Sequence, residues 1–293
     1  MTRSPAVETL LEGLVDYAGL FPPAALSMRD AVVRYGSYRR GPHQRMLGRF
    51  VVPVARLDEL ALASPSVSGA NEEPWALAAL AGVGDVETVE RFNAMYGGRL
   101  QVDTIEARAE DVETVAALAS VFDPTFAIYV EVDVRRDPTP LIEAIAANGL
   151  RAKMRTGGVT ADAFPGTADI VRFLAACVAA KVRFKATAGL HHPIRGEFAL
   201  TYAADGPRAT MHGFLNLFLA ALLLREGASS EAVTPLLEER DVAAIVAEPD
   251  GLRWRSLRVT TTQVRAARAA FAGSFGSCSF EEPIEDLTKL SLL

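Results

Sequence analysis

The chain repeats one pattern along most of its length: a short apolar or mixed run, a polar loop, and a helical segment. Six such runs can be recognised, and they begin at Met46, Trp75, Leu100, Phe126, Leu150 and Val182. Successive starts are 29, 25, 26, 24 and 32 residues apart, which is about the length that a strand, a helix and two loops require. The period therefore predicts parallel strands that alternate with helices.

The segments between these runs carry helix signals at both ends. The segment "GDVETVERFNAMYGG" has an aspartate before its periodic part and glycines after it. The segment "DPTPLIEAIAANG" opens on Asp-Pro and ends on Asn-Gly. Such residues cap helices because they supply the hydrogen bonds or the backbone conformations that helix ends need.

Six regular strand–helix units favour an α/β fold of the (β/α)8, or TIM, barrel type. A first strand is expected near residue 14, in "GLVDYAGLF", and an eighth at residues 274–280, in "SFGSCSF". We expect one domain over residues 1–293, with a helix-rich insertion at about 205–270 between strands seven and eight. The alternative is an open doubly wound sheet, although no G-x-G-x-x-G follows an early strand.

Composition limits the partners that this chain can have. The net charge of −6 and the isoelectric point of about 5.4 argue against nucleic-acid binding. The most apolar run, 214–224, is too short to cross a bilayer. The N-terminus also lacks the apolar core of a signal peptide. We expect a cytoplasmic protein that acts on a small molecule, without a membrane partner.

Ionisable residues lie within four consecutive predicted strands. In TIM barrels the active site lies at the carboxyl ends of the strands, and alternate residues of a strand share one face. The residues that share such a face near the strand ends are Glu106, Glu131, Lys153, Arg155, Lys185 and Thr187. Burying unpaired charges is costly, so the set indicates a shared polar cavity. The alternative is a Lys–Glu network that only fills the barrel.

Lysines within strands six and seven, the second in "FKATAG", resemble those of class I aldolase barrels of the deoxyribose-phosphate aldolase type. The resemblance covers two short strands. It implies that Lys153 forms a Schiff base with a substrate carbonyl and that Lys185 is the neighbouring cation, which lowers the pKa of its partner. A lyase of this kind requires no cofactor.

The residue types alone also favour amine chemistry at a substrate carbonyl. An amine must be deprotonated to attack a carbonyl, and burial beside another cation favours the neutral amine. Glu131 or Glu106 would then be the acid–base group. Arg155 would hold an anionic part of the substrate.

Two glycine-rich segments and one strand end complete the expected binding site. Backbone N–H groups near Gly157 and Gly158 can cradle a phosphate or carboxylate, and so can those near Gly276, Ser277 and Ser279 at the eighth strand. The alternative is that these glycines only form tight turns. Asp16, at the end of the first strand, is expected to border the cavity.

Two adjacent histidines, His191 and His192, follow strand seven. Together with Glu131, Asp133 or Asp16 they could hold a divalent metal, which suits a metal-dependent hydrolase or isomerase. Adjacent residues of an extended chain point apart, so only one histidine is expected to face the cavity. A third possibility is a non-catalytic scaffold in which the apolar helix at 214–224 forms a homo-oligomer interface.

The orientation of Lys185 discriminates between these hypotheses. Phe184 suits the apolar layer between sheet and helices, so Lys185 must point to the barrel interior. Lys153 occupies the matching place on the neighbouring strand. Two amines so close need an anion between them, and we expect this anion to be Glu131 or a bound ligand.

Overall fold

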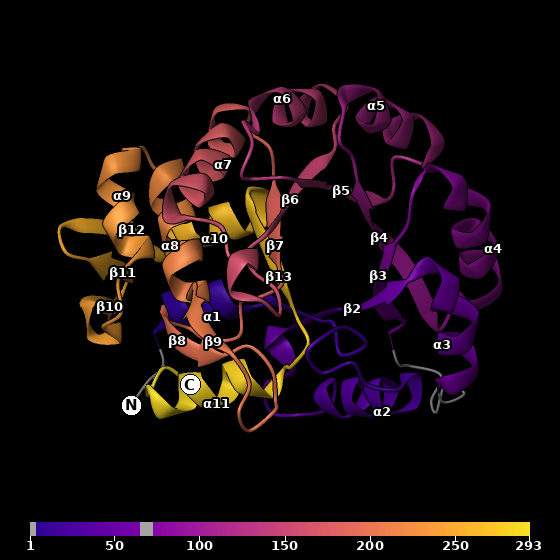
Figure 1. Ribbon diagram of the computed structural model, residues 1–293, viewed down its shortest axis with the longest axis horizontal. Helices are drawn as coiled ribbons and strands as arrows, with labels where there is room; N and C mark the ends of the chain where they lie inside the picture. Colours follow the sequence, from indigo (N-terminus) through magenta and orange to yellow (C-terminus); the bar gives the residue numbers. More distant parts are fainter. Residues whose placement is uncertain (1–3, 65–72) are drawn as a thin grey trace.

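A computed structural model describes residues 4–64 and 73–293 of the chain. Eight parallel strands close into a barrel, which Figure 1 shows surrounded by helices. The (β/α)8 prediction is confirmed, and the alternative of an open sheet is wrong. In barrel order the strands are β1 (Val15–Tyr17), β2 (Leu47–Pro53), β3 (Trp75–Leu80), β4 (Leu100–Arg108), β5 (Ala127–Val132), β6 (Arg151–Arg155), β7 (Phe184–Thr187) and β13 (Ala272–Ser277).

A helix follows each of the first seven strands and covers the barrel from outside (Figure 1). Two of these helices begin with side-chain caps: the Ser27 side chain accepts a hydrogen bond from the Asp30 N–H, and Asp111 accepts one from the Thr114 N–H. The seven helices are α2 (Met28–Tyr38), α3 (Leu57–Ala63), α4 (Val86–Tyr96), α5 (Val112–Val121), α6 (Thr139–Ala147), α7 (Thr167–Ala179) and α8 (Phe214–Arg225).

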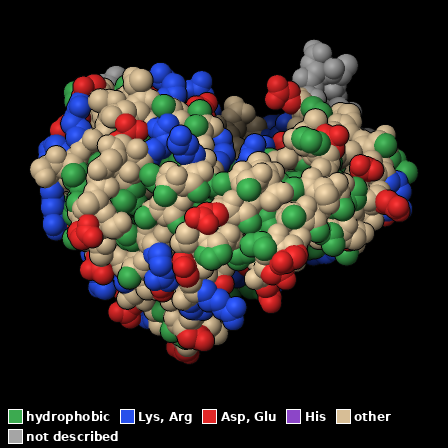
Figure 2. All heavy atoms as spheres, turned by 90° about the horizontal axis from the view of Figure 1, so that it is seen from above, with side chains coloured by type: hydrophobic (Ala, Val, Ile, Leu, Met, Phe, Trp, Pro, Cys, Tyr) green, Lys and Arg blue, Asp and Glu red, His purple; other side chains and the backbone are tan. Residues whose placement is uncertain are grey.

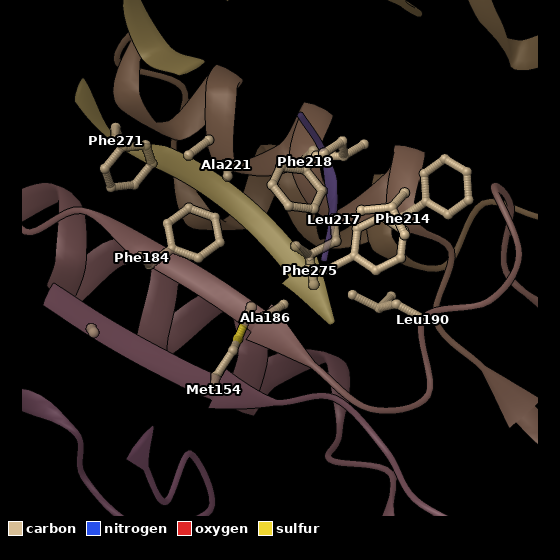
Figure 3. Close-up of a cluster of buried hydrophobic side chains, with 14 of the residues drawn as sticks. Met154, Phe184, Ala186, Leu190, Phe214, Leu217, Phe218, Ala221, Phe271 and Phe275 are labelled. Atoms are coloured by element: carbon tan, nitrogen blue, oxygen red, sulfur yellow. The ribbon is translucent and has the colours of Figure 1, made fainter. Parts of the chain in front are cut away.

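The alternation of faces along β7 sets up the main core. Phe184 points outward, and its ring lies 5.1 Å from that of Phe271 and 6.0 Å from that of Phe218, centroid to centroid. Figure 3 shows this aromatic layer between the strands and α8, with Phe275 of β13 beside it. Because outward positions are filled by Phe and other apolar residues, the intervening residues of the same strands must face the barrel interior.

The insertion between β7 and β13 is longer and less helical than predicted. It begins directly after Thr187 and contains two small antiparallel sheets in addition to helices. The segment "LRWRSLRV" forms two paired strands, because alternate residues such as Leu252, Trp254 and Val259 are buried. Its elements are β8 (Gly196–Ala199), β9 (Arg208–Met211), α8, α9 (Ser230–Leu237), β10 (Ile245–Glu248), β11 (Gly251–Trp254), β12 (Leu257–Thr260) and α10 (Thr261–Ala270).

The apolar run 214–224 is buried throughout within α8 of the single chain. It therefore does not offer the exposed apolar surface that the oligomer-interface hypothesis requires. Among the described residues, none of the helices has the length and hydropathy needed to span a membrane.

Two terminal helices complete the structure: α1 (Pro5–Leu11) packs against α10, and α11 (Glu281–Lys289) follows the last strand. The last strand ends at Ser277 rather than at residue 280, because the chain turns there toward α11. On the face shown in Figure 2, acidic and basic side chains are interspersed.

Candidate active site

A cavity of about 740 Å³ opens at the carboxyl ends of the barrel strands, where TIM barrels place their active sites. Its volume is within the range of small-molecule sites. Of the predicted site residues, those that line it are Glu106, Glu131, Lys153, Arg155, Gly158, Thr187, His191, His192 and Gly276.

Lys185 lies beneath the cavity and is only 1% exposed. Its Nζ is 2.6 Å from Asp16 Oδ2 and 2.5 Å from Glu106 Oε1. It also lies over the Tyr129 ring, 5.4 Å from the centroid. The prediction that Lys185 points into the barrel is therefore confirmed.

Lys153 lies one layer closer to solvent, and its side chain is 6% exposed. Its Nζ is 2.8 Å from Glu106 Oε2 and 2.9 Å from Glu131 Oε2. Lys153 and Lys185 are register partners on adjacent strands, as their matching places in the sequence suggested. Because Lys153 reaches the cavity whereas Lys185 does not, only Lys153 is placed to meet a substrate.

The buried charges alternate in sign along a chain from Asp16 through Lys185, Glu106 and Lys153 to Glu131. Burial alone would raise the pKa of Glu106, but the two ammonium groups lower it to about 2. Burial would lower the pKa of Lys185, but the carboxylates of Asp16 and Glu106 raise it above its usual value. The pairing thus keeps Glu106 and Lys185 ionised at neutral pH.

The anion between the two amines is Glu106 of β4, not Glu131 of β5 as expected. Inward residues of alternate strands form common layers in such barrels. Glu106 therefore reaches past β5 to the lysines of β6 and β7, and Tyr129 occupies the position beside it on β5. Glu131, one inward position higher, contacts Lys153 and the exposed Arg108, whose Nε is 3.3 Å away.

Asp16 anchors the inner end of this chain of charges instead of bordering the cavity. It accepts hydrogen bonds from Ser274 Oγ at 2.5 Å and from the Arg49 N–H at 2.7 Å. The neighbouring residue on β2 is Gly48, where a Cβ would lie 2.2 Å from Asp16 Oδ1. Glycine is thus required at position 48 for the close approach of the carboxylate.

Arg155 is exposed at the rim of the cavity, on the same face of β6 as Lys153. Its guanidinium makes no hydrogen bond or ion pair within residues 4–64 and 73–293. An unpaired guanidinium beside a cavity suits a carboxylate or phosphate.

The glycine-rich segments contribute less to the cavity than expected. Gly157, Ser277 and Ser279 do not line it in the described part of the chain. A Cβ at Gly189 would lie 2.8 Å from the Gly157 Cα, so these two glycines let the loops after β6 and β7 approach closely. The hydroxyl of Ser279 accepts a hydrogen bond from the Glu282 N–H, at the start of α11.

Both histidines line the cavity, although only one was expected to do so. His191 Nδ1 lies 2.8 Å from Glu282 Oε2, and His192 Nδ1 lies 2.6 Å from Asp286 Oδ2, both on α11. Burial lowers the pKa of His192, partly offset by Asp286. The His192 ring also stacks on Phe198, with 3.5 Å between the centroids. The histidines therefore connect the barrel mouth to α11 and to the β8–β9 hairpin.

The structure does not favour the metal-site hypothesis. The described residues include no group of three or more His, Cys, Asp or Glu side chains placed to hold a metal ion. Each histidine is paired with a different carboxylate, and Asp133 is exposed in the turn after β5, where its carboxylate accepts a hydrogen bond from the Arg135 N–H.

Several residues that line the cavity were not predicted from sequence. The β8–β9 hairpin contributes Phe198, Tyr202 and Arg208, and α11 contributes Glu282. Cys278 also lines it, but burial raises the pKa of this thiol and so disfavours a nucleophilic thiolate. No local signal marks these residues, because loops far along the chain bring them to the barrel mouth.

Comparison with known proteins adds no family to this description. No protein-family model matches the sequence, and neither does any curated protein.

Proposed function

We propose that this protein is an enzyme of the lyase type, which uses Lys153 to form a Schiff base with a small, oxygenated, anionic carbonyl substrate. The observation that carries the proposal is the position of Lys153, a nearly buried amine at the base of the cavity, held between two carboxylates. Such an amine is fixed in place and has proton acceptors within hydrogen-bond distance.

The reaction begins when Glu131 takes a proton from Lys153, since both lysines hold Glu106 ionised. The amine then adds to the substrate carbonyl, and the same proton returns to the departing hydroxyl group, so that water leaves and an iminium ion forms. Cleavage of the neighbouring carbon–carbon bond places its electron pair in the iminium system and yields an enamine and an aldehyde. Protonation of the enamine and hydrolysis of the imine restore Lys153.

Carbon–carbon cleavage also requires a base for the substrate hydroxyl at the leaving carbon, and His191 is placed to be that base. In the tautomer whose Nδ1–H is donated to Glu282, Nε2 is the acceptor. Nε2 makes no hydrogen bond to any residue that the structure describes, and His191 lines the cavity. Lys153 and His191 line the same cavity, so one substrate can contact both.

In this proposal Lys185 is a positioning residue. Two carboxylates offset its charge, so its effect on Lys153 passes through Glu106, which it holds ionised and oriented.

Borohydride trapping tests the nucleophile. Full-length protein is mixed with pyruvate, glyoxylate, acetaldehyde or dihydroxyacetone phosphate, reduced, and analysed by intact mass and peptide mapping. We expect a stable adduct on Lys153 with at least one probe. Lys153→Arg keeps a cation between the two glutamates, so it should fold normally yet form no adduct. An adduct on Lys185, or no adduct with any probe, would contradict the proposal.

Arg155 is expected to bind the anionic group of the substrate. Arg155→Gln should raise the pyruvate concentration needed for half-maximal trapping about 10- to 100-fold, because a hydrogen bond to a charged group contributes about 1.5–3 kcal/mol. Trapping of acetaldehyde, which has no anionic group, should change little. Arg136→Gln, a change at an exposed arginine outside the cavity, is the matched control. Equal effects on pyruvate and acetaldehyde would exclude this role.

A further inference from the structure

One wall of the cavity is apolar. Ala18, Phe21, Val51 and Leu80, from the region of β1 to β3, line it and form a small hydrophobic cluster with Ala78. Its buried members, Ala18, Val51 and Ala78, are separate from the large core between the barrel and its helices, and Phe21 packs against both. The cavity thus has an apolar half, from the region of β1 to β3, and a charged half, from β4 to β6, which meet at the register partners Leu80 and Glu106.

The apolar and charged halves differ because different kinds of side chain face the barrel interior on different strands. On β2 the inward residue is Val51, whereas its neighbours Phe50 and Val52 belong to the core outside the barrel. On β4 to β6 the inward residues near the same end are Glu106, Glu131 and Lys153. Asp85, at the rim above the apolar half, is already engaged, because its carboxylate accepts a hydrogen bond from the Gly82 N–H.

The β8–β9 hairpin adds the apolar side chains of Phe198, Leu200 and Met211 to the lining of the cavity, with Phe198 stacked on His192 of the loop after β7. Arg208 of the same hairpin is engaged with Glu197, whose backbone carbonyl accepts a hydrogen bond from the guanidinium at 2.7 Å. A three-carbon acid held at Lys153 would leave most of the 740 Å³ unfilled and the apolar wall wet.

We propose that the substrate is an amphipathic 4-hydroxy-2-oxo acid whose branched alkyl or aryl group lies against Ala18, Phe21, Val51 and Leu80. The inference rests on the proposed function for the placement of the carbonyl at Lys153. Its carboxylate is adjacent to the carbonyl and lies toward Arg155, two residues further along the same face of β6. The chain of the acid then extends across the cavity to the apolar wall.

Binding of simple acids tests the apolar subsite without requiring any chemistry at Lys153. Calorimetric titration of the full-length protein compares acetate with 4-methylpentanoate. Each buried CH2 group strengthens binding about fourfold, so 4-methylpentanoate should bind at least about tenfold more tightly than acetate. Equal affinities would overturn the inference.

A pair of neighbouring valines supplies the matched variants. Val51→Thr keeps the shape of the wall but replaces a methyl with a hydroxyl, and should weaken 4-methylpentanoate binding about fivefold without affecting acetate. Val52→Thr alters the residue next along the strand, which faces the helices, and should leave the preference unchanged. If both variants changed the preference equally, the wall would not be the binding surface.

The two proposals fail in different ways. If pyruvate is trapped on Lys153 but 4-methyl-2-oxopentanoate is trapped at no lower concentration, the apolar subsite is overturned and the lysine chemistry stands. If no carbonyl probe is trapped but 4-methylpentanoate binds preferentially through Val51, the lysine chemistry is overturned and the subsite stands.

Discussion

Replacing Lys185 with methionine is expected to lower the free energy of unfolding by about 3–5 kcal/mol at pH 7. Lys185 is the shared cation of Asp16 and Glu106, and removing one partner of a buried ion pair leaves an uncompensated charge in the interior. At this size of protein the loss corresponds to a fall in Tm of about 6–10 °C. Urea and thermal unfolding of the two proteins measure both quantities.

Two further variants show whether the loss arises from the buried charges. Lys289→Met removes a lysine that pairs with Asp286 at the surface, where its side chain is 69% exposed, and should cost less than about 1 kcal/mol. Adding Asp16→Asn to Lys185→Met should recover part of the loss, because it removes one of the carboxylates left unpaired. A Lys185→Met protein as stable as the parent would show that the ion-pair chain contributes nothing to folding.

Acid should destabilise the protein through Glu106. Its folded pKa of about 2 lies below the ordinary value of 4.5. The unfolded chain therefore binds this proton first, and the stabilisation is present above about pH 4.5 and is lost as the pH falls toward 2. For this buried group the difference corresponds to about 3 kcal/mol.

The measurement is urea unfolding at several pH values between 7 and 3, for the parent protein and for Glu106→Gln. The parent should lose more stability with falling pH than the variant, which has no carboxylate to protonate at this position. Glu90→Gln changes an exposed glutamate and should follow the parent curve. Parallel curves for the parent and Glu106→Gln would mean that Glu106 is not the group responsible.

The proposed roles also explain why the barrel interior is so polar at this level. Two cations and three carboxylates occupy the region from Asp16 to Glu131, and their contacts leave little freedom for the side chains. A site of this kind holds Lys153 in one orientation before substrate arrives, which lowers the entropic cost of the addition step. Arg155, by contrast, has no partner among the described residues and remains available for the substrate.

Most of the barrel could be predicted from sequence because its signals are local. The spacing of the apolar runs reflects the length of one strand–helix unit, and the alternation within a run fixes which side chains face inward. Phe184 and Lys185 illustrate this: an apolar ring and an amine on adjacent residues can only take opposite faces. The insertion was predicted less well, since short antiparallel strands such as β11 and β12 carry weak patterns.

The composition of the site could be predicted only in part. Lys153, Glu131, Arg155 and Thr187 were assigned to the cavity from their places on strands, and the structure places them there. The role of Glu106 was underestimated, because the residue that bridges two lysines depends on the stagger of strands around a closed barrel. Stagger is a property of the whole sheet and cannot be predicted from the sequence of any one strand.

The sequence by itself determined the succession of strands and helices and the inward direction of both lysines, because each depends on periodicity within about ten residues. Only the tertiary structure decided that Lys153 meets the cavity while Lys185 lies beneath it. It also decided that Val51 lines the cavity and that α11 brings Glu282 to His191. These outcomes depend on barrel closure and on loop packing between residues more than 90 positions apart, as His191 and Glu282 are, and such contacts are invisible to local pattern.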